Sequence, residues 1–314
     1  MTLVTVGETA LRFSPPAGHR FETADEVTLQ TDGISSTAAA TAHRLGGDAV
    51  WVSKLPDTPL GRRVVAALHE HGLETDVVWA DPGDGRQGLS FYEAGAAPRE
   101  DRLLQDRTGA AMATLTPGEL PMDRLQAADV LFVAGSMAAL SETAADTAGA
   151  VLRAMPGTTA LDLDFYPGLW TAERAFETLS DLFDAVDVLF ARERQVEAVF
   201  DTTARPRELV HAIAADHGFE TVVLTRDDHD VVAFHDNVIH EHDAIETETV
   251  DVTGQHAALV GAVLERLVGG APLDEALSYG VAAAALTRTM PGPLTPLERA
   301  EVERLVDAQS DGRP

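Results

Sequence analysis

The sequence lacks cysteine, has one lysine and contains no long apolar run. Without cysteine, disulfide bonds, thiol catalysis and thiolate metal sites are excluded. No apolar stretch approaches the roughly 20 residues that a membrane-spanning helix needs. Residues 3–7 follow the first methionine directly and read as a strand, not as a secretion signal. We therefore expect a cytoplasmic protein with no membrane partner.

Positive charge is scarce. The 314 residues include 23 basic and 51 acidic side chains, for a formal charge of −28 at pH 7, and Lys54 is the single lysine. A disordered acidic chain is excluded because 45% of the residues are hydrophobic. This charge also makes the electrostatic part of nucleic-acid binding repulsive, so we expect no nucleic-acid partner.

The same charge predicts adaptation to salt. Self-repulsion opposes the compact state in dilute buffer. In about 1 M salt the Debye length falls to roughly 3 Å and most of that repulsion disappears. We interpret the composition as that of a salt-adapted, haloarchaeal-like cytosol; an ordinary acidic protein is the alternative.

Short apolar runs alternate with helical periods along the chain. This alternation predicts an α/β fold with a central, mostly parallel sheet and helices on both faces. The strand-like runs are residues 3–6, 49–52, 130–133, 159–163, 186–190, 221–224 and 231–234. The helical periods are residues 36–45, 61–71, 142–155, 172–183, 205–217, 257–267 and 273–290. No linker divides the chain, so we expect one domain over residues 1–314.

Two segments, residues 13–31 and 86–107, interrupt this alternation with short strand-like stretches and turns. We expect them to form a small β-sheet that stands off the main sheet as a lid over its carboxyl edge. An ordinary decorated loop is the alternative.

Several common motifs are missing. The chain has no Walker loop, no G-x-G-x-x-G after the first strand and no G-x-S-x-G. His240 and His242 could share one strand face and hold a metal, but on so acidic a surface we expect plain polar residues and no metal site. The most informative segment has Asp251 and Thr253 before a turn at Gly254, followed by an apolar helix. Such a turn offers backbone N–H groups and a positive helix end to an anion.

This turn resembles the D-T-x-G-A-G-D motif of the ribokinase-like (PfkB-type) carbohydrate kinases, which Asp251, Thr253 and Gly254 match. Residues 46–61 are similar to the first signature region of that family. Six further segments resemble the 2-keto-3-deoxygluconate kinase branch in particular: residues 7–9, 12–16, 95–99, 106–107, 162–170 and 279–284. The resemblance covers nearly the whole chain. It implies the ribokinase-like fold, ATP-dependent phosphorylation of a sugar hydroxyl with Mg²⁺, and a homodimer paired through its lids, whose exposed edge needs cover.

Several positions depart from the family pattern. The resemblance places the anion hole at Gly254, Gln255 and His256, and the general base at position 257, which is Ala257. A methyl group accepts no proton, so a contribution of about 10²–10⁴-fold is lost and no competent catalytic residue remains. His256 replaces a glycine, and we expect its side chain to crowd the amides that bind phosphate. His256 acting as a displaced base is the alternative, which we do not expect, because a residue one position earlier on a helix points roughly 100° away from the needed direction.

The nucleotide region departs in the same direction. Thr225 opens the segment that corresponds to the family's T-x-G-x-x-G turn, where Asp227 and Asp230 replace the two glycines. Carboxylates beside a triphosphate cost about 4 kcal/mol per pair at 4 Å before screening. The family's N-x-x-E motif, which is linked to Mg²⁺, is represented by Arg192 and Gln195.

In the substrate cleft, the family's Arg and Lys after the fifth strand are replaced by Tyr166 and Gly168. Arg107 is the one arginine that still matches a family carboxylate-binding position. The resemblance assigns the whole cleft to Gly33, Thr37, Ser90, Gln105, Arg107 and Tyr166.

Misalignment, drift or salt adaptation could account for each departure singly. Together they fall on the base, nucleotide, metal and sugar positions. We therefore expect a sugar kinase homologue that has lost the reaction and binds a sugar-acid-like ligand or a protein partner. The alternative is an active kinase of 2-keto-3-deoxy sugar acids with a displaced base, using ATP and Mg²⁺. A third reading is different chemistry in the same cleft.

Overall fold

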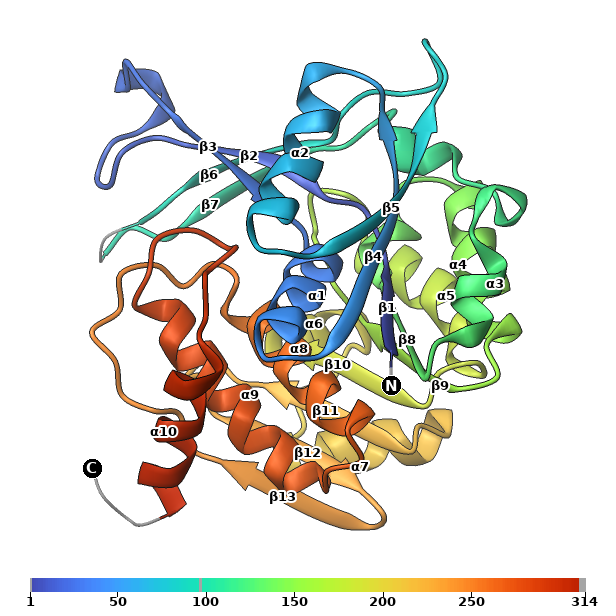
Figure 1. Cartoon of the computed structure of the whole chain (residues 1–314). Helices are drawn as coiled ribbons and strands as arrows, with labels where there is room; N and C mark the ends of the chain where they lie inside the picture. The colour runs from blue at the N-terminus through green and yellow to red at the C-terminus, as the bar shows by residue number, and fades with distance from the viewer. Residues whose placement is uncertain (1, 96–97, 311–314) are drawn as a thin grey trace.

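Nine strands form the central sheet of the computed structural model, which describes residues 2–95 and 98–310 (Figure 1). Seven of the nine strands run parallel, and the last two in the sequence, β12 and β13, are added by antiparallel pairing at one edge. This confirms the predicted α/β class. The order across the sheet is β13 (Val238–His242), β12 (Val231–His235), β11 (Thr221–Thr225), β10 (Val188–Arg192), β9 (Thr158–Asp162), β8 (Val130–Ala134), β1 (Thr2–Val6), β4 (Asp48–Pro56) and β5 (Glu74–Ala80).

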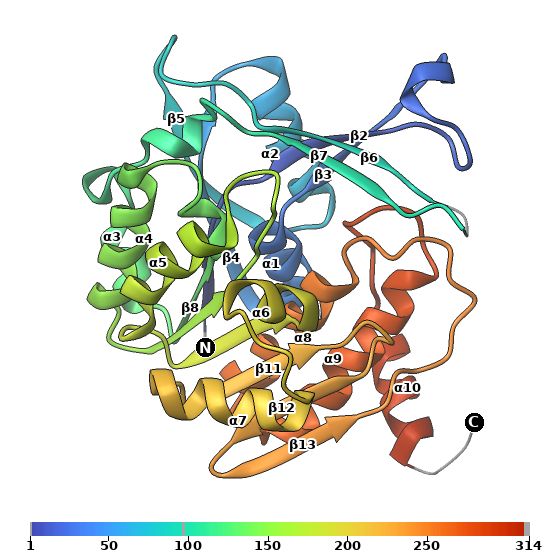
Figure 2. The ribbon, with the colours of Figure 1, turned by 180° about the vertical axis from the view of Figure 1, so that it is seen from behind.

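Neighbouring residues of a strand point to opposite sides of the sheet. In this sheet both sides are apolar, and helices cover each of them. Val4 faces the core under α3–α7, whereas Leu3 faces the core under α1, α2, α8 and α9. Figure 2 shows the α4–α7 side, and α10 packs against α9. The helices are α1 (Ile34–Arg44), α2 (Pro59–Glu70), α3 (Met122–Ala127), α4 (Glu142–Ala154), α5 (Ala172–Phe183), α6 (Glu193–Val199), α7 (Pro206–His217), α8 (Gln255–Val268), α9 (Leu273–Arg288) and α10 (Arg299–Ser310).

A second, four-stranded sheet stands off the main one (Figure 1). Its order is β3 (Thr28–Asp32), β2 (Ala10–Ser14), β6 (Leu89–Glu93) and β7 (Arg102–Asp106), so β3 and β7 are its edges. Phe13 stacks on Phe91 across the β2–β6 pair with ring centroids 5.4 Å apart. The predicted lid segments, 13–31 and 86–107, supply most of this sheet. Ala96 and Ala97, within the family-like segment 95–99, lie outside the described residues.

The elements that sequence patterns did not predict are β5, β13, α3, α6 and α10. Strands β5 and β13 are edges, and only Ala80 of the two is buried. Within residues 2–95 and 98–310, no helix is both long and apolar enough to cross a bilayer. Short 3-10 helices span Phe21–Thr23, Ala111–Thr114, Pro117–Glu119 and Gly135–Met137.

Candidate active site

The carboxyl ends of three neighbouring strands meet the start of α8 at one edge of the sheet. Asp162, Arg192 and Thr225 are the last residues of β9, β10 and β11. The strand registers pair Phe190 with Asp162 and Arg192 with Thr225, so these ends lie side by side. In open α/β sheets this edge is where ligands bind.

The turn before α8 is held tightly. Asp251 accepts hydrogen bonds from the Thr253 amide (2.9 Å) and hydroxyl (2.7 Å), and from the Gly292 amide (2.8 Å). Gly254 has φ +79°, and a Cβ there would lie 2.2 Å from the Pro293 carbonyl oxygen, so only glycine fits. The first helical bond runs from the Ala258 amide to Gly254. The N–H groups of the preceding first turn are therefore available to an anion.

The predicted base position is apolar. Ala257 is 5% exposed and belongs to the core that packs under α1 and α8. His256 is 3% exposed. We expected its imidazole to crowd the amides that bind phosphate, and this expectation was wrong. The ring instead turns toward the sheet, where Nδ1 lies 2.6 Å from Thr225 Oγ1 and Nε2 lies 2.6 Å from Asp162 Oδ2. These two hydrogen bonds hold it away from the open side of the turn.

A buried polar cluster lies between the lid and the main sheet. Arg107 is 6% exposed; its Nη1 donates to Ser136 Oγ (3.3 Å), its Nε lies 3.5 Å from Glu8 Oε2, and its guanidinium lies over the Tyr166 ring. Burial raises the pKa of Glu8, and Arg107 opposes that rise. Both Glu8 carboxylate oxygens and Arg107 Nε make no hydrogen bond among the described residues.

Asp164 adds a second carboxyl to this cluster. It has a left-handed backbone (φ 40°), is 2% exposed and leaves Oδ1 without a hydrogen-bond partner in the described part of the chain. Burial, and then the neighbouring Asp162 carboxylate, raises its pKa. Tyr166 hydrogen-bonds with Arg192, and burial raises the pKa of Tyr166. Unmatched buried acceptors require a ligand that donates hydrogen bonds, and the neighbouring arginines suit an acidic group on the same ligand.

The other predicted cleft residues lie around this cluster. Ser90 and Gln105 are cross-strand partners in β6 and β7, and each leaves a buried oxygen without a partner within residues 2–95 and 98–310. Gly168 lies against Gln105, where a Cβ would be 3.8 Å from the Gln105 Cβ. Gly33 packs on Glu8 and Thr9 at the start of α1, and Thr37 is 2% exposed.

The nucleotide-region carboxylates are paired with arginines. Asp227 lies 2.6 Å from Arg194, and Asp230 lies 3.2 Å from Arg226 while accepting from the Ala244 amide. The repulsion we expected toward a triphosphate is therefore partly offset within the turn. Gln195 donates to the Phe165 carbonyl (3.1 Å) and accepts from the Arg192 amide (3.4 Å), so it acts as a local brace.

A cavity of about 330 Å³ lies beside this turn. Arg288 connects it to α8, donating to the Gln255 side chain (3.1 Å), Thr247 (3.3 Å) and the Ile245 carbonyl (2.8 Å). Its lining also offers apolar and hydroxyl side chains, a mixture that suits a nucleoside. The lining residues are Asp228, His229, Ala244, Ile245, Glu246, Thr247, Thr249 and Arg288.

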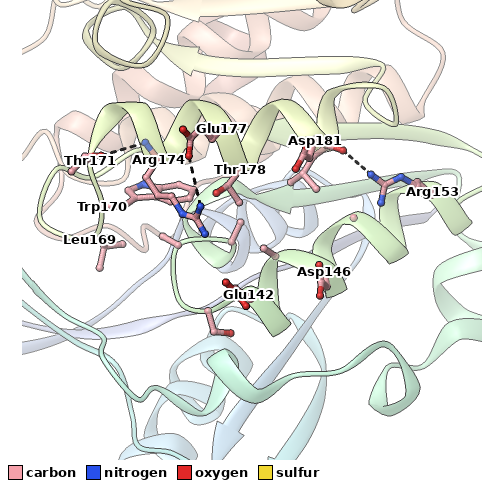
Figure 3. A pocket seen from close by; sticks show the side chains of 16 residues that line it. Glu142, Asp146, Arg153, Leu169, Trp170, Thr171, Arg174, Glu177, Thr178 and Asp181 are labelled. Carbon is pink, nitrogen blue, oxygen red and sulfur yellow. Dashed lines mark hydrogen bonds and ion pairs between the residues drawn. The ribbon is translucent and has the colours of Figure 1, made fainter.

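A larger cavity, about 920 Å³, lies between α4 and α5 and contains no predicted site residue (Figure 3). Its arginines already have partners: Arg174 pairs with Glu177 at 3.7 Å, and Arg153 donates to the Asp181 carbonyl at 2.6 Å. Because the Arg174–Glu177 pair is mostly exposed, this groove is a weaker candidate site than the cleft.

The residues present do not form a metal site of their own. Across residues 2–95 and 98–310, no three histidine or acidic side chains group closely enough to hold an ion. His240 and His242 both contact Asp274, at 3.4 and 3.1 Å, in a surface cluster far along the sheet from the cleft.

Sequence reasoning missed Glu8, Asp162, Asp164 and Ser136 as site residues. A signal was present for the two aspartates, because ionisable side chains rarely follow an apolar strand into the interior without a partner. Glu8 lies within the family-like residues 7–9, but its burial depends on Arg107, 99 positions later.

The chain is similar to known carbohydrate kinases over most of its length. The family model described as pfkB family carbohydrate kinase matches residues 2–300. A 2-dehydro-3-deoxygalactonokinase of Haloferax volcanii is 44% identical over 97% of this chain and 96% of the relative. Fructokinase-2 of Solanum habrochaites is 28% identical over 95% of this chain and 93% of its own.

Solved structures agree with this assignment. The crystal structure of 2-dehydro-3-deoxygluconokinase from Thermotoga maritima superposes with a TM-score of 0.90 at 26% identity, covering 98% of this chain and 99% of that one. The family resemblance that the motifs predicted is thus confirmed. The chain belongs to the pfkB family of carbohydrate kinases.

Proposed function

We propose that this protein is an active, ATP-dependent kinase of a 2-keto-3-deoxy (2-dehydro-3-deoxy) sugar acid. The comparisons do not support the predicted loss of activity; they favour the alternative of a kinase with a displaced base. The observation that carries the proposal is the buried cluster of Glu8, Arg107 and Asp164, whose unmatched polar atoms suit a ligand with both a carboxylate and hydroxyl groups.

The sugar acid lies, in this proposal, between the lid and the ends of β8 and β9. The Arg107 guanidinium receives the substrate carboxylate, since arginine forms charge-assisted bonds to carboxylates. Glu8 Oε1 and Asp164 Oδ1 then accept substrate hydroxyls, which satisfies both buried acceptors. Sugar hydroxyls donate to such acceptors whether or not the carboxyl carries a proton on its other oxygen.

ATP, the second substrate, places its nucleoside in the cavity beside Arg288 and its phosphates at the first turn of α8. The amides there stabilise negative charge that develops on the transferred phosphoryl group. Mg²⁺ enters with ATP as part of that substrate, because the described residues supply no cluster of their own to hold it.

Product formation tests this function. We expect the purified protein, in molar KCl, to convert 2-keto-3-deoxygalactonate or 2-keto-3-deoxygluconate to a phosphorylated product that depends on MgATP and is identified by mass. Fructose serves as the control acceptor, because it has no carboxylate for Arg107. An inactive protein that still binds the sugar acid would instead favour the ligand-binding reading.

We also propose a homodimer formed through the lid. On edge strand β7, Leu103 is 44% and Leu104 63% exposed, and unpaired apolar edges of this kind favour association. We expect light scattering in molar KCl to give the mass of a dimer, and Leu104→Glu to give a monomer. Val238→Glu, at the edge of the main sheet, is the matched control and leaves the dimer intact. A wild-type monomer would refute this assembly.

A further inference from the structure

Three side chains that are far apart in the sequence are linked by hydrogen bonds into one buried series. Thr225 ends β11, Asp162 ends β9, and His256 lies in the first turn of α8. The imidazole bridges the two strand ends across β10, with both hydrogen bonds at 2.6 Å. Thr225 is 8%, His256 3% and Asp162 0% exposed. We call this set the Thr–His–Asp chain.

With Asp162 as the carboxylate, each hydrogen bond of the chain has one direction. Asp162 Oδ1 already accepts from the Asp164 amide at 2.8 Å, and an ionised carboxylate only accepts. His256 Nε2 therefore carries a proton and donates to Asp162 Oδ2, which leaves Nδ1 as an acceptor. The Thr225 hydroxyl donates to Nδ1, so its own oxygen is left free to accept a proton from another group.

Resting on the kinase function proposed above, we propose that His256 is the proton acceptor of the reaction and receives the proton through Thr225. The sugar hydroxyl oxygen forms a bond to the γ-phosphorus of ATP as the bond from that phosphorus to ADP breaks, and ADP leaves with the electron pair. The hydroxyl proton passes to Thr225 Oγ1 while the Thr225 proton passes to His256 Nδ1. Asp162 is a positioning residue that orients the imidazole and offsets its charge.

Two further observations place this chain at the reaction. It lies beside the anion-binding turn at Gly254, and position 257 next to it holds only a methyl group. The charged groups beside its Asp162 end are Asp164, which belongs to the proposed sugar subsite, and Arg192. The chain therefore runs from the proposed sugar subsite at Asp162 to the turn that is proposed to bind the phosphates.

The protein also contains a matched control. At the opposite end of β11, Thr221 Oγ1 lies 2.8 Å from His235 Nδ1, and His235 Nε2 lies 3.4 Å from Asp236. The residue types are the same, but this set is about 13 Å from Thr225 along the strand and away from the carboxyl edge. His235→Gln should leave the kinase rate unchanged.

The experiment compares wild type with Thr225→Val, Thr225→Ser, His256→Gln and Asp162→Asn in steady-state kinase assays at molar KCl, with separate titrations of ATP binding. We expect Thr225→Val and His256→Gln to lower kcat by about 10²–10⁴-fold while ATP binds as before. Thr225→Ser should retain most of the rate, because it keeps the hydroxyl. Asp162→Asn should lower kcat while KM for both substrates stays unchanged, because the imidazole remains but loses the carboxylate that orients it.

Each outcome decides a different question. If folded Thr225→Val or His256→Gln keeps kcat within about threefold of wild type, the inference is overturned, because a general base contributes far more than that. The kinase function would still stand. A loss of kcat that follows a loss of ATP binding also overturns the inference, because the chain would then only shape the turn. If a variant does not fold, the solvent deuterium isotope effect on the chemical step of the wild type decides: a step with no isotope effect excludes proton transfer through Thr225 to His256. An inactive wild type refutes the kinase function itself.

Discussion

Arg107→Met should raise KM for the sugar acid by about 10²–10³-fold and leave the binding of ATP unchanged, given that removing one partner of a buried charge pair costs about 2–5 kcal/mol in binding. The guanidinium is 6% exposed and is the group that we assign to the substrate carboxylate. Methionine keeps much of the side-chain volume, so the loss reports charge and hydrogen bonding. Initial rates at varied sugar-acid concentration measure it. A KM within threefold of wild type would contradict the assignment.

The same substitution should destabilise the protein in a pH-dependent way. Glu8 would lose the stronger of the two arginines, Arg107 and Arg86, that oppose the rise in its pKa, while the burial that raises this pKa would remain. A carboxyl whose folded pKa lies above its unfolded value of about 4.5 is destabilising when ionised. The penalty, about 3–5 kcal/mol for a broken buried pair, is therefore largest at neutral pH and shrinks as pH falls toward the unfolded pKa.

Glu8→Gln combined with Arg107→Met provides the control for both effects. The double variant removes the Glu8 charge together with its partner, and the buried Asp164 keeps Arg192 nearby, so its unfolding free energy should recover part of the loss. Its KM for the sugar acid should not recover, because the carboxylate-binding group is still absent. Denaturant unfolding at several pH values, beside the kinetic assay, separates the two roles. Equal recovery of stability and KM would mean that Arg107 acts only through packing.

Melting temperature should rise steeply with salt. The chain carries a formal charge of −28 with one lysine, and the Debye length falls from about 10 Å at 0.1 M to about 3 Å at 1 M salt. Relief of several kcal/mol of repulsion corresponds to roughly 2 °C per kcal/mol for a domain of a few hundred residues. We expect a rise in Tm of about 10 °C or more on this scale between dilute buffer and molar KCl.

A charge variant separates screening from other effects of salt. Glu70, Asp184, Asp216 and Glu220 are exposed and make no ion pair within the described residues. Changing all four to lysine brings the formal charge from −28 to −20, since each exchange adds two units. This variant should melt higher than wild type in dilute buffer and respond less to KCl. An unchanged salt response would contradict the salt-adapted interpretation, because salting-out of apolar surface would then explain it.

Local pattern predicted the central elements of this fold. Strands β1, β8 and β11 are buried on both faces, so their apolar runs stand out in the sequence. The sequence patterns did not predict the edge strands β5 and β13, because one side of an edge strand faces solvent and its composition resembles that of a loop. The Asp251–Gly254 turn was also predictable, since Gly254 is required by its own backbone conformation and by the contact with Pro293.

The sequence alone determined the family, the acidic charge and the loss of a carboxyl at position 257. Only the tertiary structure showed what the neighbouring His256 contacts. His256 meets Asp162 across 94 positions and Thr225 across 31, and no local pattern encodes such contacts. Read along the chain, His256 was expected to obstruct phosphate, and as a base it was expected to point roughly 100° away from the needed direction. In the fold it is a buried, hydrogen-bonded imidazole, because the end of a parallel sheet gathers side chains from strands that are far apart in sequence.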